Sequence, residues 1–75
     1  MLTAKRLSTL RAIAELWRRG YGPSHREIAE YQGLSLRAVQ CRLDGLADEG
    51  YIFREWALQR ATRLTRLGRK ALKVT

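Results

Sequence analysis

Apolar side chains recur in the first two-thirds of the chain at the spacing of amphipathic helices, and short polar stretches separate them. In the first segment they recur every three or four residues, so they fall on one face of a helix. This stripe consists of Leu7, Leu10, Ile13, Ala14 and Trp17. Thr3 can cap the first turn, and Pro23 with its neighbouring glycines cannot continue a helix. The pattern predicts a first helix over about 3–19.

Two helix-start signals bracket the next apolar groups. Ser24 is followed three residues later by Glu27, which is the spacing of a capping box, and it predicts a second helix over about 24–31. Ser35 is the second start signal and predicts a third helix over about 35–49. The apolar face of this third helix consists of Val39, Leu43 and Leu46.

The spacing of three small or apolar residues relates the second and third helices to each other. Two helices that cross steeply need a small residue at the crossing, a turn residue that tolerates positive φ, and an apolar residue that packs back. Ala29, Gly33 and Val39 supply these in order. This spacing is typical of a helix-turn-helix, whose second helix enters the major groove of DNA.

The segment after Gly50 admits two interpretations. Its two ends, Tyr51 to Phe53 and Thr62 to Leu64, favour β-strands, whereas residues 54–61 have good helix propensity and no turn residue. Thr65 can begin a last helix over about 65–74. We expect a two-stranded wing over about 51–64, and a helix over 54–61 remains the alternative.

These elements define the predicted fold class. It is an α+β fold, a small winged helix-turn-helix with a three-helix core, a two-stranded β wing and a short C-terminal helix. With 75 residues, the chain forms a single domain over 1–75. Four aromatic residues are expected in the core or at its edge: Trp17, Tyr31, Tyr51 and Phe53. The position of Trp56 is ambiguous.

Charge narrows the function. The formal net charge is +8, which indicates a polyanionic partner, either nucleic acid or an anionic membrane surface. No apolar run is long enough to span a membrane, and the N-terminus lacks the apolar segment of a secretory signal. We therefore expect no membrane partner, and a cytoplasmic, DNA-associated protein.

Catalytic and ligand-binding chemistry has little support in the sequence. Paired carboxylates, a nucleophile–base pair and a phosphate-binding loop are all missing, so we expect no enzyme and no cofactor. Cys41 is the one cysteine, and His25 has no neighbours at metal-ligand spacing, so no metal site is predicted. No small-molecule effector site is evident.

Several short motifs follow one another along the chain: Leu2-Thr3-Ala4, Gly22-Pro23-Ser24, Glu27-Ile28-Ala29, Gly33 and Leu43-x-x-Leu46-Ala47-x-x-Gly50-Tyr51-Ile52. In this order they resemble the N-terminal DNA-binding domain of the LexA repressor family. The tail Leu64-Thr65-x-x-Gly68-Arg69-x-x-Leu72 instead resembles the close of MarR-type winged helices. The LexA protease domain has no counterpart in the sequence, so self-cleavage is not expected.

The resemblance implies where DNA would be contacted. The face of the third helix opposite its apolar side carries Arg37, Ala38, Cys41 and Gly45, with Gln40 and Asp44 on its shoulder. Arginine suits the O6/N7 edge of guanine and glutamine the N6/N7 edge of adenine. In the wing, Arg60 and Arg63 are expected on phosphates. The full expected DNA-binding set is Ser24, Arg26, Ser35, Leu36, Arg37, Ala38, Gln40, Cys41, Arg60 and Arg63.

Three functions fit these features. The first is a sequence-specific binder of double-stranded DNA, a transcriptional regulator or repressor that acts as a homodimer. The second is a winged-helix module that docks on RNA polymerase or another protein. The third is a non-specific architectural or phage DNA-binding protein, which the high charge favours.

Overall fold

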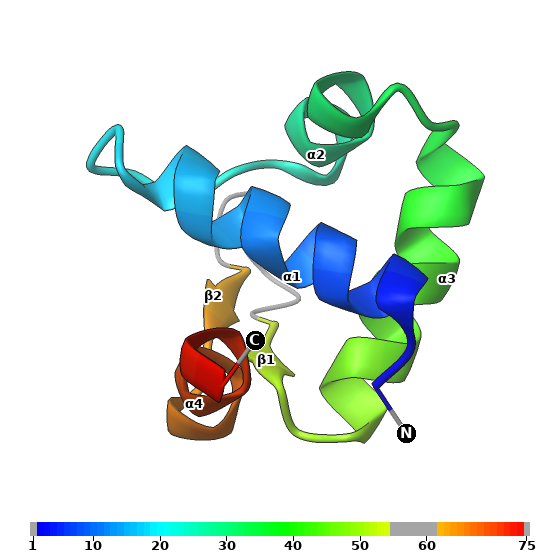
Figure 1. The fold of residues 1–75 in the computed structure, drawn as a ribbon. Coiled ribbons are helices and arrows are strands. Elements are labelled where there is room, and N and C mark those ends of the chain that lie inside the picture. The colour runs from blue at the N-terminus through cyan, green and yellow to red at the C-terminus, as the bar shows by residue number, and fades with distance from the viewer. Residues whose placement is uncertain (1, 55–61, 75) are drawn as a thin grey trace.

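The computed structural model describes residues 2–54 and 62–74. Its elements are, in chain order, α1 (Ala4–Trp17), α2 (His25–Gln32), α3 (Leu36–Asp48), β1 (Ile52–Phe53), β2 (Arg63–Leu64) and α4 (Arg66–Val74). α1 crosses the middle of the molecule between α2 on one side and the two strands on the other, and α3 runs along one end (Figure 1). The expected winged helix-turn-helix fold is thereby confirmed.

The three predicted N-caps lie at the starts of the first three helices. The side-chain oxygens of Thr3, Ser24 and Ser35 each accept a hydrogen bond from a backbone N–H three residues later, at 3.2, 3.1 and 3.1 Å. The predicted bounds agree with the structure to within two residues. The largest difference is at the end of α1, which stops at Trp17 because the next backbone N–H groups bond to carbonyls only three residues back.

The hydrophobic core is shared by the first three helices and β1. It consists of Leu10, Ile13, Ile28, Ala29, Val39, Leu43, Leu46 and Ile52, each at most 5% exposed. The expectation that Tyr31 and Phe53 lie in the core or at its edge is wrong, since they are 56% and 50% exposed. Tyr31 is two residues beyond Ala29 and so points to the other side of the helix, while Ile52 takes the inward position of β1.

A polar contact that the apolar stripe does not reveal joins α1 to its neighbours. Thr9 is fully buried, and its hydroxyl donates to Oε1 of Gln32 at 2.8 Å. The guanidinium of Arg42 on α3 donates to the same hydroxyl oxygen at 3.3 Å. A single threonine thus connects three helices, and its burial is compensated by hydrogen bonds.

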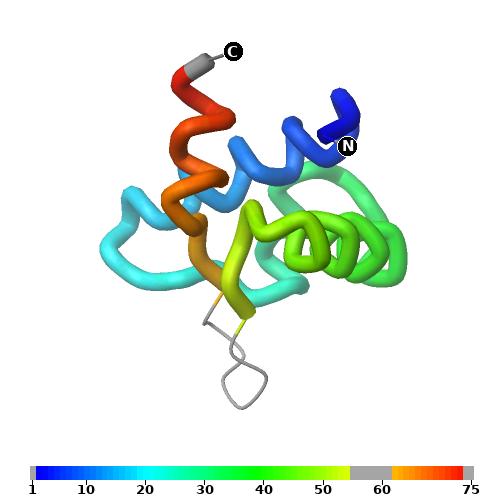
Figure 2. Tube along the Cα trace, turned by 90° about the horizontal axis from the view of Figure 1, so that it is seen from below, coloured from blue at the N-terminus to red at the C-terminus, as the bar shows by residue number. Residues whose placement is uncertain are grey.

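The wing consists of an antiparallel pair in which Ile52 lies opposite Leu64 and Phe53 opposite Arg63. The indole N–H of Trp17 donates to the carbonyl of Thr62 at 2.7 Å, which attaches β2 to α1. α4 and α3 lie on opposite sides of the paired strands (Figure 2). The predicted strand pair is confirmed, whereas the expectations for residues 55–61, Trp56 and Arg60 included, lie outside the described residues.

Candidate nucleic-acid interface

The turn between α2 and α3 is fixed by hydrogen bonds around a single glycine. Gly33 has φ of 66°, as its predicted turn role requires. The N–H of Leu34 bonds to the carbonyl of Ala29 at 2.9 Å, and that of Gly33 bonds to the carbonyl of Glu30 at 3.3 Å. This is the hydrogen-bond pattern of a Schellman motif. It ends α2 and directs the chain into Ser35 at the start of α3.

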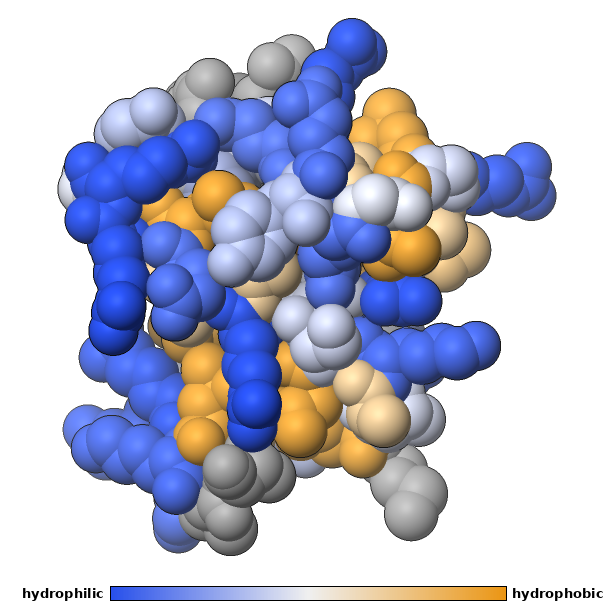
Figure 3. All heavy atoms as spheres, turned by 45° about the horizontal axis from the view of Figure 1, so that its top comes forward, coloured by the Kyte–Doolittle hydropathy of each residue, from blue (hydrophilic) through white to orange (hydrophobic). Residues whose placement is uncertain are grey.

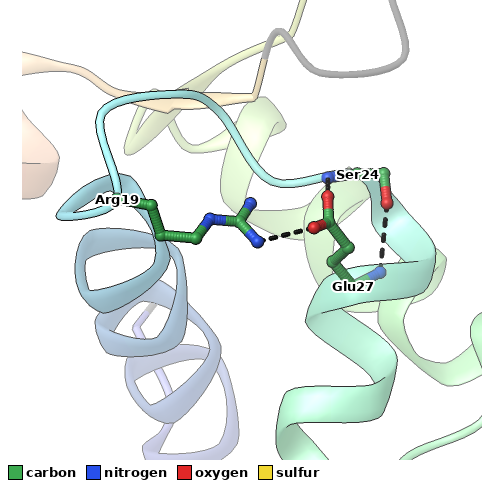
Figure 4. A network of polar contacts seen from close by, with 3 residues as sticks. All are labelled: Arg19, Ser24 and Glu27. Carbon is green, nitrogen blue, oxygen red and sulfur yellow. Dashed lines mark hydrogen bonds and ion pairs between the residues drawn. The ribbon is translucent and has the colours of Figure 1, made fainter.

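The start of α2 is held by a capping box and an ion pair (Figure 4). The backbone N–H of Ser24 donates to Oε1 of Glu27 at 2.8 Å, and the N–H of Glu27 donates to Oγ of Ser24. Arg19, just after α1, donates to Oε2 of Glu27 at 2.6 Å. This hydrogen bond from Arg19 is the main reason that the pKa of Glu27 falls to about 2. The carboxylate therefore anchors the loop between α1 and α2.

The solvent-facing side of α3 is a polar stripe. Its exposed members are Leu36, Arg37, Gln40, Cys41, Asp44 and Asp48, and Ala38 is half-buried. On the opposite side Val39, Leu43 and Leu46 are fully buried. We call the solvent-facing stripe the α3 face. Residue types whose side chains are able to hydrogen-bond to base edges thus lie on the helix that a helix-turn-helix presents to the major groove.

The expectation that Gly45 belongs to the α3 face needs a correction. A side-chain atom at Gly45 would overlap the guanidinium of Arg6, which lies across it. Arg6 reaches over the glycine to Glu49 and pairs with its carboxylate at 2.5 Å. The lack of a side chain at Gly45 therefore leaves room for Arg6 on α1 to reach Glu49 at the end of α3. The α3 face is centred nearer Gln40 and Asp44 than the helical projection indicated.

The other expected DNA-binding residues that the structure describes lie on α2, at two helix N-termini and on the wing. Arg26 is exposed in the first turn of α2. Arg63 is exposed on β2 with its guanidinium carbon 6.0 Å from the ring centroid of Phe53. Ser24 and Ser35 use their hydroxyls as caps at two helix N-termini, where backbone N–H groups favour phosphate.

Some basic side chains form ion pairs within the domain, and others do not. Arg6, Arg18, Arg19 and Arg54 pair with Glu49, Glu15, Glu27 and Asp44. Among the described residues, Arg26, Arg37 and Arg63 have no acidic partner. Further exposed cations lie on α4: Arg66, Arg69, Lys70 and Lys73. The positive charge at the α3 face and the wing is therefore free to meet a polyanion.

The pair between Arg54 and Asp44 was missed from the sequence. Its nitrogen and oxygen are 2.5 Å apart, and it joins the end of β1 to the α3 face. The charges of both side chains act on His25, at the start of α2. Burial lowers the pKa of His25 most, the positive charge of Arg54 lowers it further, and Asp44 raises it. The sequence placed Asp44 on the shoulder of the expected face, but the angle of β1 that brings Arg54 to it depends on tertiary packing.

The face formed by α1 and α2 differs from the α3 face. It holds a groove of about 470 Å³ lined by Ala4, Leu7, Ser8, Arg11, Ala12, Glu15, Tyr31 and Gln32. Figure 3 shows one side of the molecule, on which apolar surface is exposed between long hydrophilic side chains. Within residues 2–54 and 62–74, His, Cys, Asp and Glu side chains form no group that could hold a metal ion. Over the same residues, no helix is long and apolar enough to cross a membrane.

A helix-turn-helix with an exposed polar second helix, followed by a two-stranded wing, defines the class of winged helix-turn-helix domains. Within this class the chain belongs to the LexA DNA-binding domain family, because the family model described as the LexA DNA binding domain matches residues 1–61. No curated protein matches the chain. The chain is therefore a DNA-binding protein. The match ends before the tail, so the likeness of residues 64–72 to MarR-type domains stays a prediction.

Proposed function

We propose that this domain binds double-stranded DNA sequence-specifically and regulates transcription as a homodimeric repressor. The observation that carries the proposal is the composition of the α3 face. Arg37 and Gln40 are exposed there, one turn apart, and no acidic side chain among the described residues pairs with Arg37. Hydrogen-bonding side chains on a recognition helix read bases, whereas a protein-docking helix would present an apolar face.

Each expected residue that the structure describes has a role in this proposal. Arg37 would donate two hydrogen bonds to a guanine and Gln40 would pair with an adenine. The apolar or weakly polar members of the face suit thymine methyl groups and sugars; they are Leu36, Ala38 and Cys41. Phosphate contacts would come from the helix N-termini and from exposed cations on α2 and the wing, namely Ser24, Arg26, Ser35 and Arg63.

Dimerisation follows from the size of the reading surface. One α3 face spans a short half-site, which recurs often in a genome, and two related faces multiply the specificity. A homodimer binds a palindromic operator because its two-fold axis coincides with that of the DNA. A repressor needs only to occupy such an operator over a promoter.

Selection from a random pool of DNA duplexes with the purified protein tests the proposal. We expect an enriched motif, and a palindrome in it supports the homodimer. Arg37→Ala should weaken or remove one position of the motif. The control is Arg66→Ala, which removes the same charge from an exposed site on α4 and should leave the motif unchanged. Binding without any enriched motif would refute sequence specificity and favour the non-specific DNA-binding alternative.

A further inference from the structure

An acid and a base that the proposed contacts leave unused meet between α3 and the end of β1. Nη1 of Arg54 lies 2.5 Å from Oδ1 of Asp44. The side chain of Arg54 is 7% exposed, whereas that of Asp44 is 62% exposed. The pair is therefore buried on its cationic side and open to solvent on its anionic side.

Asp44 points in nearly the same direction as Arg37. Seven residues separate them, and over seven residues a helix drifts by only about 20°. The same seven residues advance about 10 Å along the helix axis, while successive base pairs are about 3.4 Å apart. If Arg37 faces a base pair, Asp44 faces another two to three steps along the groove.

The buried arginine changes what Asp44 can do at a DNA surface. A lone carboxylate there is repelled by the phosphates, but the guanidinium of Arg54 compensates its charge at hydrogen-bonding distance. Arg54 occupies Oδ1, and no other described residue bonds to the carboxylate of Asp44. Oδ2 is left as an acceptor on a side chain that is 62% exposed.

Two elements fix the orientation of this carboxylate. Asp44 belongs to α3, and Arg54, which pairs with it, follows β1. A side chain held by an ion pair to a buried partner loses less further freedom when it meets a ligand, so its hydrogen bond favours one geometry.

We propose that Asp44 reads a cytosine by accepting a hydrogen bond from its N4 amino group, and that Arg54 is the positioning residue that orients and neutralises Asp44. In the major groove cytosine presents its N4 amino group as a hydrogen-bond donor, and an aspartate carboxylate can accept this hydrogen bond. The proposal rests on the sequence-specific function proposed above and adds one base position to it.

The test is the random-pool selection, run in parallel with wild type, Asp44→Asn, Arg54→Gln and Asp48→Asn. Asparagine keeps an oxygen for Arg54, so the fold of the first variant should persist, and thermal unfolding of each protein checks this. Asp48 lies one turn further along the same face and has no acid–base partner among the described residues. Asp48→Asn therefore removes one negative charge from α3, as Asp44→Asn does, and leaves the pair of Asp44 and Arg54 intact.

We expect the wild-type motif to contain a cytosine two to three base pairs from the position that Arg37→Ala relaxes. Asp44→Asn should lower the preference for that cytosine about fivefold or more and shift it toward adenine, which asparagine pairs with. Arg54→Gln should weaken the same preference and lower affinity for all duplexes. Asp48→Asn should leave the motif intact.

Two results overturn the inference while the proposed function survives. One is a wild-type motif that Asp44→Asn leaves unchanged. The other is a rise in affinity for every duplex, equal for Asp44→Asn and Asp48→Asn, because Asp44 would then act only as a charge near phosphates. A wild-type selection without any motif refutes the proposed function itself, and the inference with it.

Discussion

The carbonyl oxygen of Tyr51 occupies the space that a side chain on Gly68 would need. A Cβ atom at Gly68 would overlap this oxygen, which also accepts a hydrogen bond from the N–H of Thr65 at 3.1 Å. The hydroxyl of Thr65 in turn accepts from the N–H of Gly68 and donates to the carbonyl of Gly50. The first turn of α4 therefore packs backbone to backbone against the entry to β1.

Gly68→Ala should lower the free energy of unfolding by about 1–3 kcal/mol, as overpacking of a rigid site does. The new methyl group meets a backbone oxygen that is fixed by hydrogen bonds and cannot move aside. Urea denaturation followed by circular dichroism measures the change.

Gly45→Ala is the matched control for that variant. Its methyl group would displace the end of the flexible Arg6 side chain and not backbone. Alanine also gains up to about 1 kcal/mol over glycine inside a helix, which offsets the loss of the contact with Glu49. We expect a change within about 1 kcal/mol. Equal losses for both variants would show that the approach of α4 to Tyr51 is not rigid.

Local signals account for the part of the fold that the sequence predicted well. Ser24 with Glu27, Ser35 and Gly33 act on backbone atoms within a few residues of themselves, so their effect is readable without the tertiary structure. Gly50, at φ of 82°, closes α3 in the same way as Gly33 closes α2. The helix bounds and the turn were therefore predictable.

Contacts across elements account for the part that was missed. Arg54 is ten residues from Asp44, and Thr9 is more than twenty from Gln32. Nothing local to Asp44 indicates which cation will reach it, because several arginines are candidates and the choice depends on how β1 leaves α3. Arg37 and Gln40 were placed correctly on the exposed side of α3, since helical periodicity alone determines that.

Acid should weaken the attachment of the loop before α2. The pKa of Glu27 is lowered to about 2 from 4.5, mainly by the hydrogen bond from Arg19. A carboxyl with a depressed folded-state pKa contributes stability that is present above 4.5 and is lost as the pH falls toward 2. Glu27→Gln should therefore destabilise the fold at pH 7, and its difference from wild type should vanish between about pH 4.5 and 2.

Glutamine can still accept the hydrogen bond from Ser24 in the capping box, so this variant isolates the charge. Glu30→Gln, at an exposed position on the same helix without an ion pair to any described residue, is the control. Thermal unfolding over this pH range compares the three proteins. A gap between wild type and Glu27→Gln that stays constant with pH would contradict the assignment.

Binding to duplex DNA should depend strongly on salt. Each neutralised phosphate releases counterions and contributes about −0.9 to the slope of log affinity against log salt. The cations without acidic partners at the α3 face and wing, together with those of the rest of the chain, lead us to expect a slope of about −4 or steeper. Fluorescence anisotropy between low and moderate salt measures it, and a flat response would contradict phosphate contact by this surface.

Arg37→Ala and Arg63→Ala should impair DNA binding in different ways. Arg37 lies on the α3 face, where a bidentate contact to guanine is worth about 1–3 kcal/mol, so its loss should relax one position of the preferred site. Arg63 lies on the wing beside Phe53, which restricts its guanidinium without neutralising it. A phosphate contact there carries no sequence information. Its loss should weaken all duplexes equally and reduce the salt slope by about one.

Affinities for the selected site and for a scrambled duplex, each at several salt concentrations, separate these two effects. The ratio of the two affinities should fall for Arg37→Ala and stay at the wild-type value for Arg63→Ala. The salt slope on the scrambled duplex should become shallower for Arg63→Ala, because that duplex reports phosphate contacts alone. If both variants left the ratio unchanged, Arg37 would be a phosphate contact and α3 would not read bases through it.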